Sequence, residues 1–89
     1  MRFEYDPKKA CLNKEKHGVD FEQAKALWEN EAVIIQARTT GECRSMIIGW
    51  IEERLYSCVF TVRLSRIRII SCRRSSSTER GVYHEKVER

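Results

Sequence analysis

The stretch from Arg44 to Arg74, RSMIIGWIEERLYSCVFTVRLSRIRIISCRR, decides the fold class of this chain. It is rich in isoleucine, valine and aromatic residues, which favour pleated, half-buried strands. Its pattern predicts strands over about residues 44–51, 55–62 and 67–72, with a tight turn at Glu52-Glu53. Connections as short as this join antiparallel neighbours, so the stretch predicts an antiparallel meander.

Two helices are expected before these strands. The dipeptide Asp6-Pro7 is typical of a helix start, and this first helix should run to about His17. A second helix should begin after Asp20, because Gln23, three residues later, completes a capping box. Both helices would then lie in the N-terminal third of the chain.

The remaining segments complete an α+β domain over residues 1–89. Residues 32–37 predict a further strand, with a turn at 39–42, and residues 1–5 a short edge strand. Residues 76–79 offer another capping box, which would open a C-terminal helix. We therefore expect two N-terminal helices, an antiparallel sheet of about four strands and a C-terminal helix. The helices should pack on one face of the sheet and leave the other partly open.

The positive charge is concentrated at the end of the chain. Residues 62–89 carry eight Lys and Arg against three acids, a net +5, whereas residues 1–31 are net −1 and residues 32–61 are neutral. A localised basic patch is typical of a protein that binds a polyanion. An acidic protein partner is the alternative.

Location and cysteine usage also limit the function. No apolar run approaches the roughly 20 residues of a membrane span, and acids follow the N-terminus at once, so we expect a cytoplasmic protein. The cysteines lack metal-ligand spacing to one another or to histidine. We expect free, buried thiols and neither a metal nor a cofactor. The cysteines stand at Cys11, Cys43, Cys58 and Cys72.

The strongest functional signal is a row of arginines over residues 63–74, which holds five arginines and no acid. Strand alternation places Arg66 and Arg68 on one face, while Ile67 and Ile69 point to the other face and pack against helices. Guanidinium groups bind phosphate bidentately and keep their charge. The row therefore favours a nucleic-acid-binding surface over a merely solvated strand face.

Lys16 and His17 are the second candidate site. Cleavage of RNA by internal attack needs one group to take the proton of the 2′-hydroxyl and another to protonate the leaving oxygen, and histidine exchanges protons near neutral pH. Both residues also complement the dipole at a helix C-terminus, and spacing alone favours that interpretation. For Glu79 and Tyr83, a capping role and a core role are the simpler interpretations.

Several of these motifs together resemble the BrnT toxin family. Residues 3–7, FEYDP, and 16–24, KHGVDFEQA, are similar to the family's FEWDP and KHGVSFEEA. Residues 68–74, RIISCRR, are similar to its RIISARR signature. Arg44 with Ile48-Gly49, and Glu79-Arg80 with Tyr83, match further positions. The motifs follow the family's order over nearly the whole chain.

The resemblance implies a type II toxin with a RelE-like fold, which arrests growth as an endoribonuclease. Because the sequence holds no cluster of metal ligands, we expect this cleavage to be metal-independent. The resemblance also implies a BrnA-like ribbon-helix-helix antitoxin that neutralises the toxin in a hetero-oligomer, which binds its own promoter DNA. From the family motifs and the arginine row, we expect the catalytic residues to be Lys16, His17, Arg68 and Arg73. The expected RNA-binding residues are Arg44, Arg63, Arg66, Arg74, Glu79 and Tyr83.

The chain departs from the family pattern between two of its strands. Val62 stands where the family usually has Glu before Arg63, and Leu64-Ser65 replaces a Gly-Asp type of turn, which weakens the turn chemistry. The alternative function is a non-catalytic basic module that binds an acidic protein or nucleic acid. Cleavage of RNA in EDTA by the partner-free protein distinguishes the two.

Overall fold

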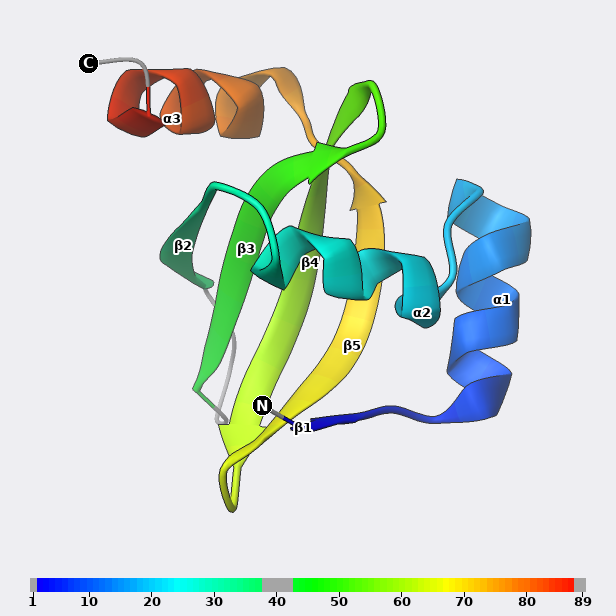
Figure 1. Cartoon of the computed structure of the whole chain (residues 1–89). Coiled ribbons are helices and arrows are strands. Elements are labelled where there is room, and N and C mark those ends of the chain that lie inside the picture. The colour runs from blue at the N-terminus through cyan, green and yellow to red at the C-terminus, as the bar shows by residue number, and fades with distance from the viewer. Residues whose placement is uncertain (1, 38–42, 88–89) are drawn as a thin grey trace.

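A computed structural model describes residues 2–37 and 43–87, so the turn expected at 39–42 lies outside the described residues. Within these ranges the chain forms three α-helices and five strands (Figure 1). In chain order the elements are β1 (Arg2–Glu4), α1 (Pro7–His17), α2 (Phe21–Ala24), the 3-10 helix η1 (Lys25–Trp28), β2 (Ala32–Ala37), β3 (Arg44–Ile51), β4 (Arg54–Arg63), β5 (Arg66–Arg74) and α3 (Ser77–Val87).

The strands form one mixed sheet in the order β1-β5-β4-β3-β2. The antiparallel meander of β2 to β5 is confirmed. The prediction of about four antiparallel strands was wrong by one strand, because β1 adds to β5 in parallel, with Arg2 opposite Arg66. Three residues show too little alternation to predict which distant strand they pair with.

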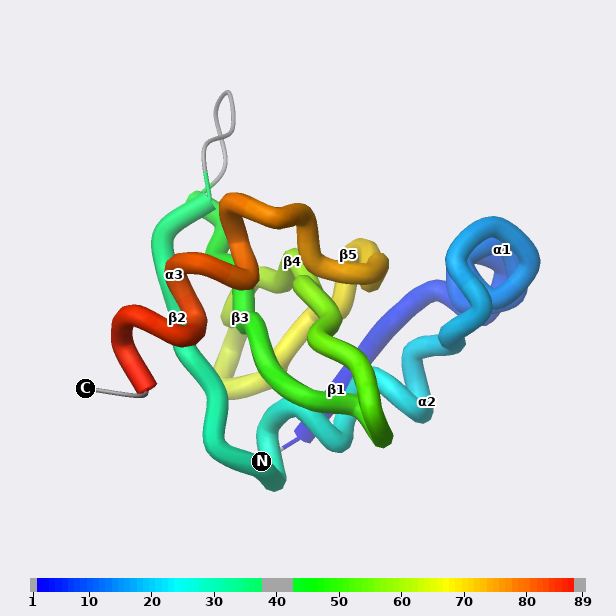
Figure 2. Tube along the Cα trace, turned by 90° about the horizontal axis from the view of Figure 1, so that it is seen from above, coloured from blue at the N-terminus to red at the C-terminus, as the bar shows by residue number. Residues whose placement is uncertain are grey.

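Helices lie on both faces of the sheet, so the expectation that they all pack on one face was wrong, although α3 leaves its face partly open, as expected. Figure 2 shows α3 on one side of the strands and α2 on the other. The reason lies in β3, where the buried neighbours Ile47 and Ile48 point to opposite faces. Ile47 packs in the cluster beneath Phe21, and Ile48 packs with Leu55 and Tyr83 of α3.

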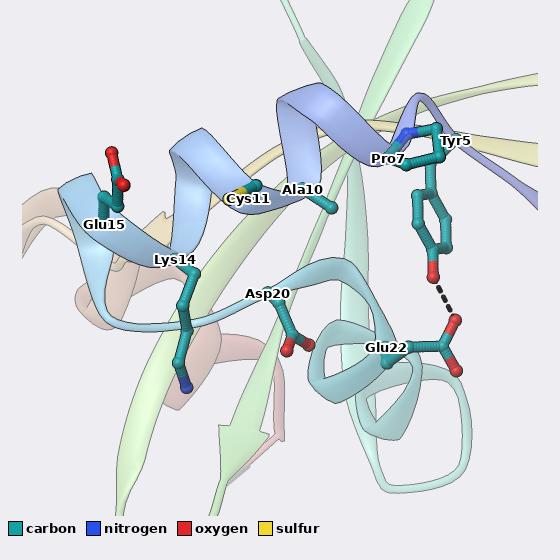
Figure 3. Close-up of a pocket in the computed structure, with 8 residues that line it drawn as sticks. All are labelled: Tyr5, Pro7, Ala10, Cys11, Lys14, Glu15, Asp20 and Glu22. Atoms are coloured by element: carbon teal, nitrogen blue, oxygen red, sulfur yellow. Dashed lines mark hydrogen bonds between the residues drawn. The ribbon is translucent and has the colours of Figure 1, made fainter.

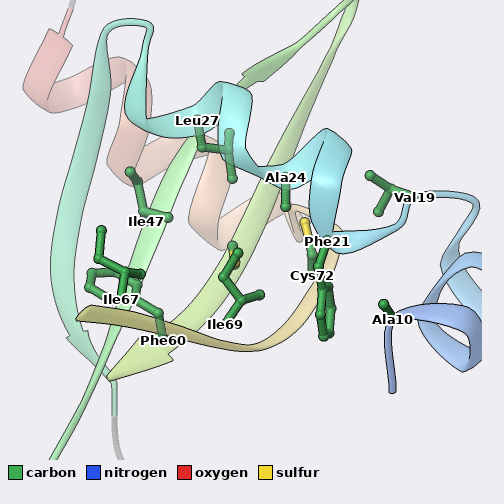
Figure 4. Close-up of a cluster of buried hydrophobic side chains, with 11 residues drawn as sticks. Ala10, Val19, Phe21, Ala24, Leu27, Ile47, Phe60, Ile67, Ile69 and Cys72 are labelled. Atoms are coloured by element: carbon green, nitrogen blue, oxygen red, sulfur yellow. The ribbon is translucent and has the colours of Figure 1, made fainter. Parts of the chain in front are cut away.

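The larger core lies between the sheet and the N-terminal helices (Figure 4). Phe21 and Leu27 are fully buried there. The 3-10 helix η1 approaches β3 so closely that a Cβ on Gly49 would lie 3.2 Å from Leu27 Cδ2. Cys58 and Cys72 are buried opposite each other in this core, as expected, whereas Cys11 and Cys43 are exposed, contrary to expectation. A hydrogen bond with the Cys72 thiol, together with burial, raises the pKa of Cys58 well above its usual value.

A β-bulge interrupts β5. Val59 pairs with Ser71 and Phe60 pairs with Ile69, so Ile70 is an extra residue without a partner on β4. Strict alternation would place Arg68 and Arg73 on opposite faces of the sheet, because five positions separate them. The bulge shifts the alternation by one residue and brings both arginines to the face on which α3 lies.

Helix α1 lies along the part of β5 that β1 leaves unpaired, and Asn13 holds it there. The Asn13 amide nitrogen donates to the carbonyl oxygens of Cys72, at 2.7 Å, and Val19, at 2.8 Å. Its Oδ1 accepts from the Cys72 N–H at 3.2 Å. Asn13 is buried, and it satisfies backbone groups that a neighbouring strand would otherwise pair.

Candidate active site

Arg68 lies beside the edge strand β1, on the face of the sheet that α3 leaves partly uncovered. Its neighbours on that face are Glu4 of β1 and Thr61 of β4. Arg68 Nη1 forms an ion pair with Glu4 Oε2 at 3.0 Å, and the Arg68 side chain remains 37% exposed. The sequence of the arginine row contains no acid, but the fold brings the carboxylate of Glu4 against Arg68. Sequence reasoning missed Glu4, although the FEYDP motif contains it.

Arg73 is held more tightly, by Glu79 in the first turn of α3. Two parallel hydrogen bonds of 2.8 Å join its guanidinium to the two carboxylate oxygens. Glu79 Oε1 also accepts from Ser57 Oγ and from the Ser76 N–H, both at 2.9 Å. The Arg73 hydrogen bonds are the main cause that lowers the pKa of Glu79 to about 2, and those from Ser76 and Ser57 add to it.

This network confirms the capping role of Glu79. Ser76 Oγ accepts from the Glu79 N–H at 3.2 Å, while Glu79 reaches back to the Ser76 N–H, so both bonds of the predicted capping box are present. A carboxylate with so low a pKa is a weak base near neutral pH. Glu79 therefore fixes the guanidinium of Arg73 in place, and proton transfer falls to other groups.

A cavity of about 330 Å³ opens on the same face, beside the Arg73–Glu79 pair. Arg44 enters it from β3, and Met46 and Val59 form its apolar floor. Val59 pairs with Ser71, which lies on β5 between the two central arginines. Arg44 thus lines the hollow together with Glu79, whose carboxylate holds Arg73 beside it, and a cation above an apolar floor suits an anion with an apolar part.

Thr61 is a second residue that sequence reasoning missed. It lies opposite Arg68 on β4, it is buried, and no described residue makes a hydrogen bond with its hydroxyl. Buried hydroxyls nearly always have a partner. Nothing in the pattern of residues 55–62 distinguishes this threonine from a packing residue, so only the structure identifies it.

Lys16 and His17 approach β5 from the last turn of α1. They line a cavity of about 220 Å³ together with Ile70 and Ser71, at the bulge. Gly18 ends the helix there with a φ of 76°, in the left-handed conformation that favours glycine. Ser71 lies between Arg68 and Arg73 on the same face, so this helix end borders the arginine face, although both residues also complement the helix dipole.

The other expected RNA-binding residues lie further away. Arg63 and Arg66 flank the hairpin between β4 and β5, where they line a hollow with Glu4 and Leu64. Arg74 lies at the opposite end of β5, in a separate cavity at the start of α3. Tyr83 is only 3% exposed and packs in the smaller core, which confirms its core role. Its contact with RNA stays a prediction, and burial weighs against it.

A further cavity of about 420 Å³ lies between α1 and α2, away from the arginine face (Figure 3). Tyr5 donates a hydrogen bond to Glu22 at its rim. This bond raises the pKa of Tyr5 to about 12 and is the main cause that lowers the pKa of Glu22. Glu22, Glu15 and Asp20 outnumber the lining lysine, Lys14, so the cavity does not suit a phosphate.

The described residues give no sign of a metal site or of a membrane-spanning helix. Among residues 2–37 and 43–87, no three His, Cys, Asp or Glu side chains come together as a metal site. None of the helices described in those ranges is long and apolar enough to cross a membrane. The arginine face, with Arg44, Arg68 and Arg73, is therefore the candidate active site.

Comparison with known proteins identifies the family. Residues 5–79 match the family of the ribonuclease toxin BrnT of type II toxin–antitoxin systems. The chain belongs to the BrnT family. The match runs from Tyr5, the middle residue of the FEYDP motif, to Glu79 and confirms the resemblance drawn from the motifs. Membership in a type II family implies an antitoxin partner.

The fold of this BrnT family member resembles a solved structure. It is similar to the crystal structure of the ribonuclease toxin BrnT from Brucella abortus, with 26% sequence identity and a TM-score of 0.67. The likeness covers 86% of this chain and 99% of the Brucella chain. It confirms the α+β class. No curated protein matches the chain in sequence.

Proposed function

We propose that this BrnT family member is an endoribonuclease that cleaves RNA without a metal ion, with Arg68 and Arg73 at its active site. The observation that supports the proposal is the bulge at Ile70, which places both arginines on one face. Each guanidinium is oriented by a carboxylate, Glu4 for Arg68 and Glu79 for Arg73. Preorganised positive charge of this kind stabilises the charge that develops at a phosphate in the transition state.

The chemistry requires no group from outside the chain. The 2′-hydroxyl of the RNA loses its proton to a base and attacks the adjacent phosphorus. The bond from phosphorus to the 5′-oxygen then breaks, and an acid protonates that leaving oxygen, which gives a 2′,3′-cyclic phosphate and a 5′-hydroxyl. Lys16 and His17, which border β5 at Ser71, are the proposed proton-transfer groups.

We further propose that the protein acts in the cytoplasm, that its fold is RelE-like and that its ribonuclease activity arrests growth. A ribbon-helix-helix antitoxin would neutralise it by covering the arginine face with an acidic segment, and the complex would bind its own promoter DNA. Co-expression with the cognate antitoxin, followed by size exclusion, tests the partner. We expect a complex that masks ribonuclease activity, and recovery of free toxin beside soluble antitoxin would contradict it.

Cleavage in the presence of a chelator tests the central proposal. Partner-free protein should cut RNA in EDTA at an unchanged rate, because the proposed groups are all side chains of this chain. Product ends should be cyclic phosphate and 5′-hydroxyl. If EDTA abolished cleavage and a divalent metal restored it, the mechanism would be wrong. If the pure protein bound RNA without cutting it, a binding module would be the better description.

A further inference from the structure

A second basic cavity, of about 280 Å³, lies at the end of the sheet where α3 begins. Trp50 and Arg54 reach it from the β3–β4 hairpin, Arg74 from the end of β5, and Arg80 and His84 from α3. Glu53 is the one acid among the residues that line it, against three arginines. The cavity therefore has a positive balance and an aromatic wall.

The aromatic wall is held in a fixed geometry by Tyr83. Its ring meets the Trp50 ring edge-on, with centroids 6.3 Å apart and planes at 89°. It meets the His84 ring in the same way at 5.5 Å and 85°. Trp50 nevertheless remains 39% exposed. A large, partly exposed indole supported from behind by a buried tyrosine is well placed to stack with a planar ligand.

One arginine of the cavity, Arg80, is held by a hydrogen bond. Arg80 Nη1 donates to the Ser75 carbonyl at 2.8 Å, which leaves its other N–H groups for a ligand. Arg54 and Arg74 are exposed at the strand ends. Guanidinium groups with free donors bind phosphate oxygens, and indole rings stack on bases. This combination suits one nucleotide.

The cavity is adjacent to the arginine face. Arg73 points to Glu79 on that face, and the next residue, Arg74, lines this cavity. Helix α3 stands between the two sites, since Glu79 borders one and Arg80 the other. An RNA strand with a phosphate at Arg73 therefore needs only to continue past the start of α3 to reach Trp50.

We infer that this cavity is a nucleotide subsite, in which Trp50 stacks with a base and Arg54, Arg74 and Arg80 contact the phosphate of a residue next to the cleaved one. The inference rests on the proposed function, which places the cleaved RNA at Arg73 and so defines the path of the RNA strand toward this cavity. It also gives Tyr83 a role that its burial allows, that of a positioning residue that orients Trp50 and His84.

Trp50 fluorescence tests the subsite directly. The background substitution Trp28→Phe leaves Trp50 as the sole tryptophan and keeps an aromatic ring between Phe3 and Phe60. The probe is a mixed-sequence hexanucleotide of 2′-O-methyl RNA, which lacks the attacking hydroxyl and so reports binding alone. We expect the probe to quench Trp50 fluorescence in a saturable, salt-dependent way.

Substitutions then identify the contacts. Binding is measured by the fluorescence anisotropy of a labelled probe. Trp50→Leu should weaken this binding by about 10-fold or more, because base stacking on an aromatic ring is lost. Trp50→Phe should recover most of that loss. Arg54→Ala should weaken binding and lower the slope of log affinity against log salt by about 0.7. Lys86→Ala, which removes an exposed cation of α3 outside the cavity, is the matched control and should leave both quantities unchanged.

The outcomes separate this inference from the proposed function. Quenching by the probe supports the subsite even if unmodified RNA is never cut. The absence of cutting would count only against the proposed cleavage. Normal cleavage with no quenching, and with wild-type affinity in Trp50→Leu, would overturn the subsite and leave the proposed function standing. Quenching by the purified antitoxin and not by the probe would assign the cavity to the protein partner and overturn the inference. Thermal melting of each variant verifies that a loss of binding is not a loss of fold.

Discussion

The two halves of β5, on either side of Ile70, hold their arginines in different ways. Before the bulge, β1 pairs with the strand and Arg68 has a single hydrogen bond to Glu4. After the bulge, α1 lies where a neighbouring strand would pair, and Arg73 is fixed by two hydrogen bonds to Glu79 of α3. The first half is regular strand, and the second is held by side chains from helices at both ends of the chain. In the proposed mechanism, the charge of Arg68 therefore serves chemistry alone, whereas the charge of Arg73 also stabilises the fold.

The largest expected effect is on catalysis and should appear in both halves. Arg68→Ala or Arg73→Ala should each lower the RNA cleavage rate by about 100-fold or more, because each removes a preorganised charge stabiliser. Arg66→Ala is the matched control, since Arg66 lies at the exposed end of the strand beside the hairpin. It should affect cleavage much less. Cleavage assays and growth arrest on induction measure the difference.

Arg68→Ala and Arg73→Ala should differ in their effect on the unfolding free energy, although both should lower activity. Arg68→Ala removes a half-exposed ion pair and should change the unfolding free energy by less than about 0.5 kcal/mol. Arg73→Ala strands the carboxylate of Glu79, which is only 15% exposed, and should be destabilising by roughly 1–3 kcal/mol. Wild-type toxicity in soluble Arg68→Ala and Arg73→Ala proteins would show that this face is not the active site. Inactivity explained by unfolding would return both residues to a structural role.

Asn13 should have the largest effect on stability, although its effect on cleavage is indirect, and both effects are confined to the second half. Asn13→Ala leaves the Cys72 N–H and the carbonyl oxygens of Cys72 and Val19 without their hydrogen bonds. We expect a loss of about 2–4 kcal/mol in the unfolding free energy, because these groups are buried. Cleavage should also fall as α1 moves Lys16 and His17 away from β5. Denaturant unfolding measures the first effect, and an unchanged midpoint would contradict the role given to Asn13.

These contrasts also show how far the sequence predicts the molecule. Alternation in residues 66–69 correctly separates Arg66 and Arg68 from the buried isoleucines. The bulge at Ile70 escapes prediction, because an extra residue in a strand leaves no mark in a run of apolar and basic residues. The sequence also does not predict that α3 packs on the second face of the sheet. Consecutive isoleucines in β3 look like one buried strand and do not reveal which helix each will contact.

A pH titration tests how much the Glu79 carboxylate stabilises the second half of β5. The pKa of this carboxyl falls from its ordinary 4.5 to about 2 in the folded protein, so the charged form stabilises the fold above pH 4.5. That contribution, ~2 kcal/mol at neutral pH after allowing for solvent screening, should be lost as the pH falls from about 5 to 2. Glu79→Gln should be less stable at pH 7 and should melt with a flatter pH dependence. Parallel melting curves for the two proteins from pH 7 to pH 3 would refute this assignment.

The smallest expected effect is at the hairpin before the first half of β5. Leu64 and Ser65 form its two-residue turn with φ values of 49° and 65°, and Arg63 pairs directly with Arg66. Positive φ at both central positions is the pattern of a type I′ turn, which favours Asn-Gly and disfavours leucine. Leu64 is 96% exposed, so packing does not compensate for the strain. Replacing Leu64→Asn together with Ser65→Gly should therefore raise the unfolding free energy by about 1 kcal/mol, measured by thermal or denaturant unfolding. Cleavage should be unchanged if catalysis depends on Arg68 and Arg73. A loss of cleavage in this more stable protein would instead place the hairpin in contact with RNA and extend the active face to Arg63 and Arg66.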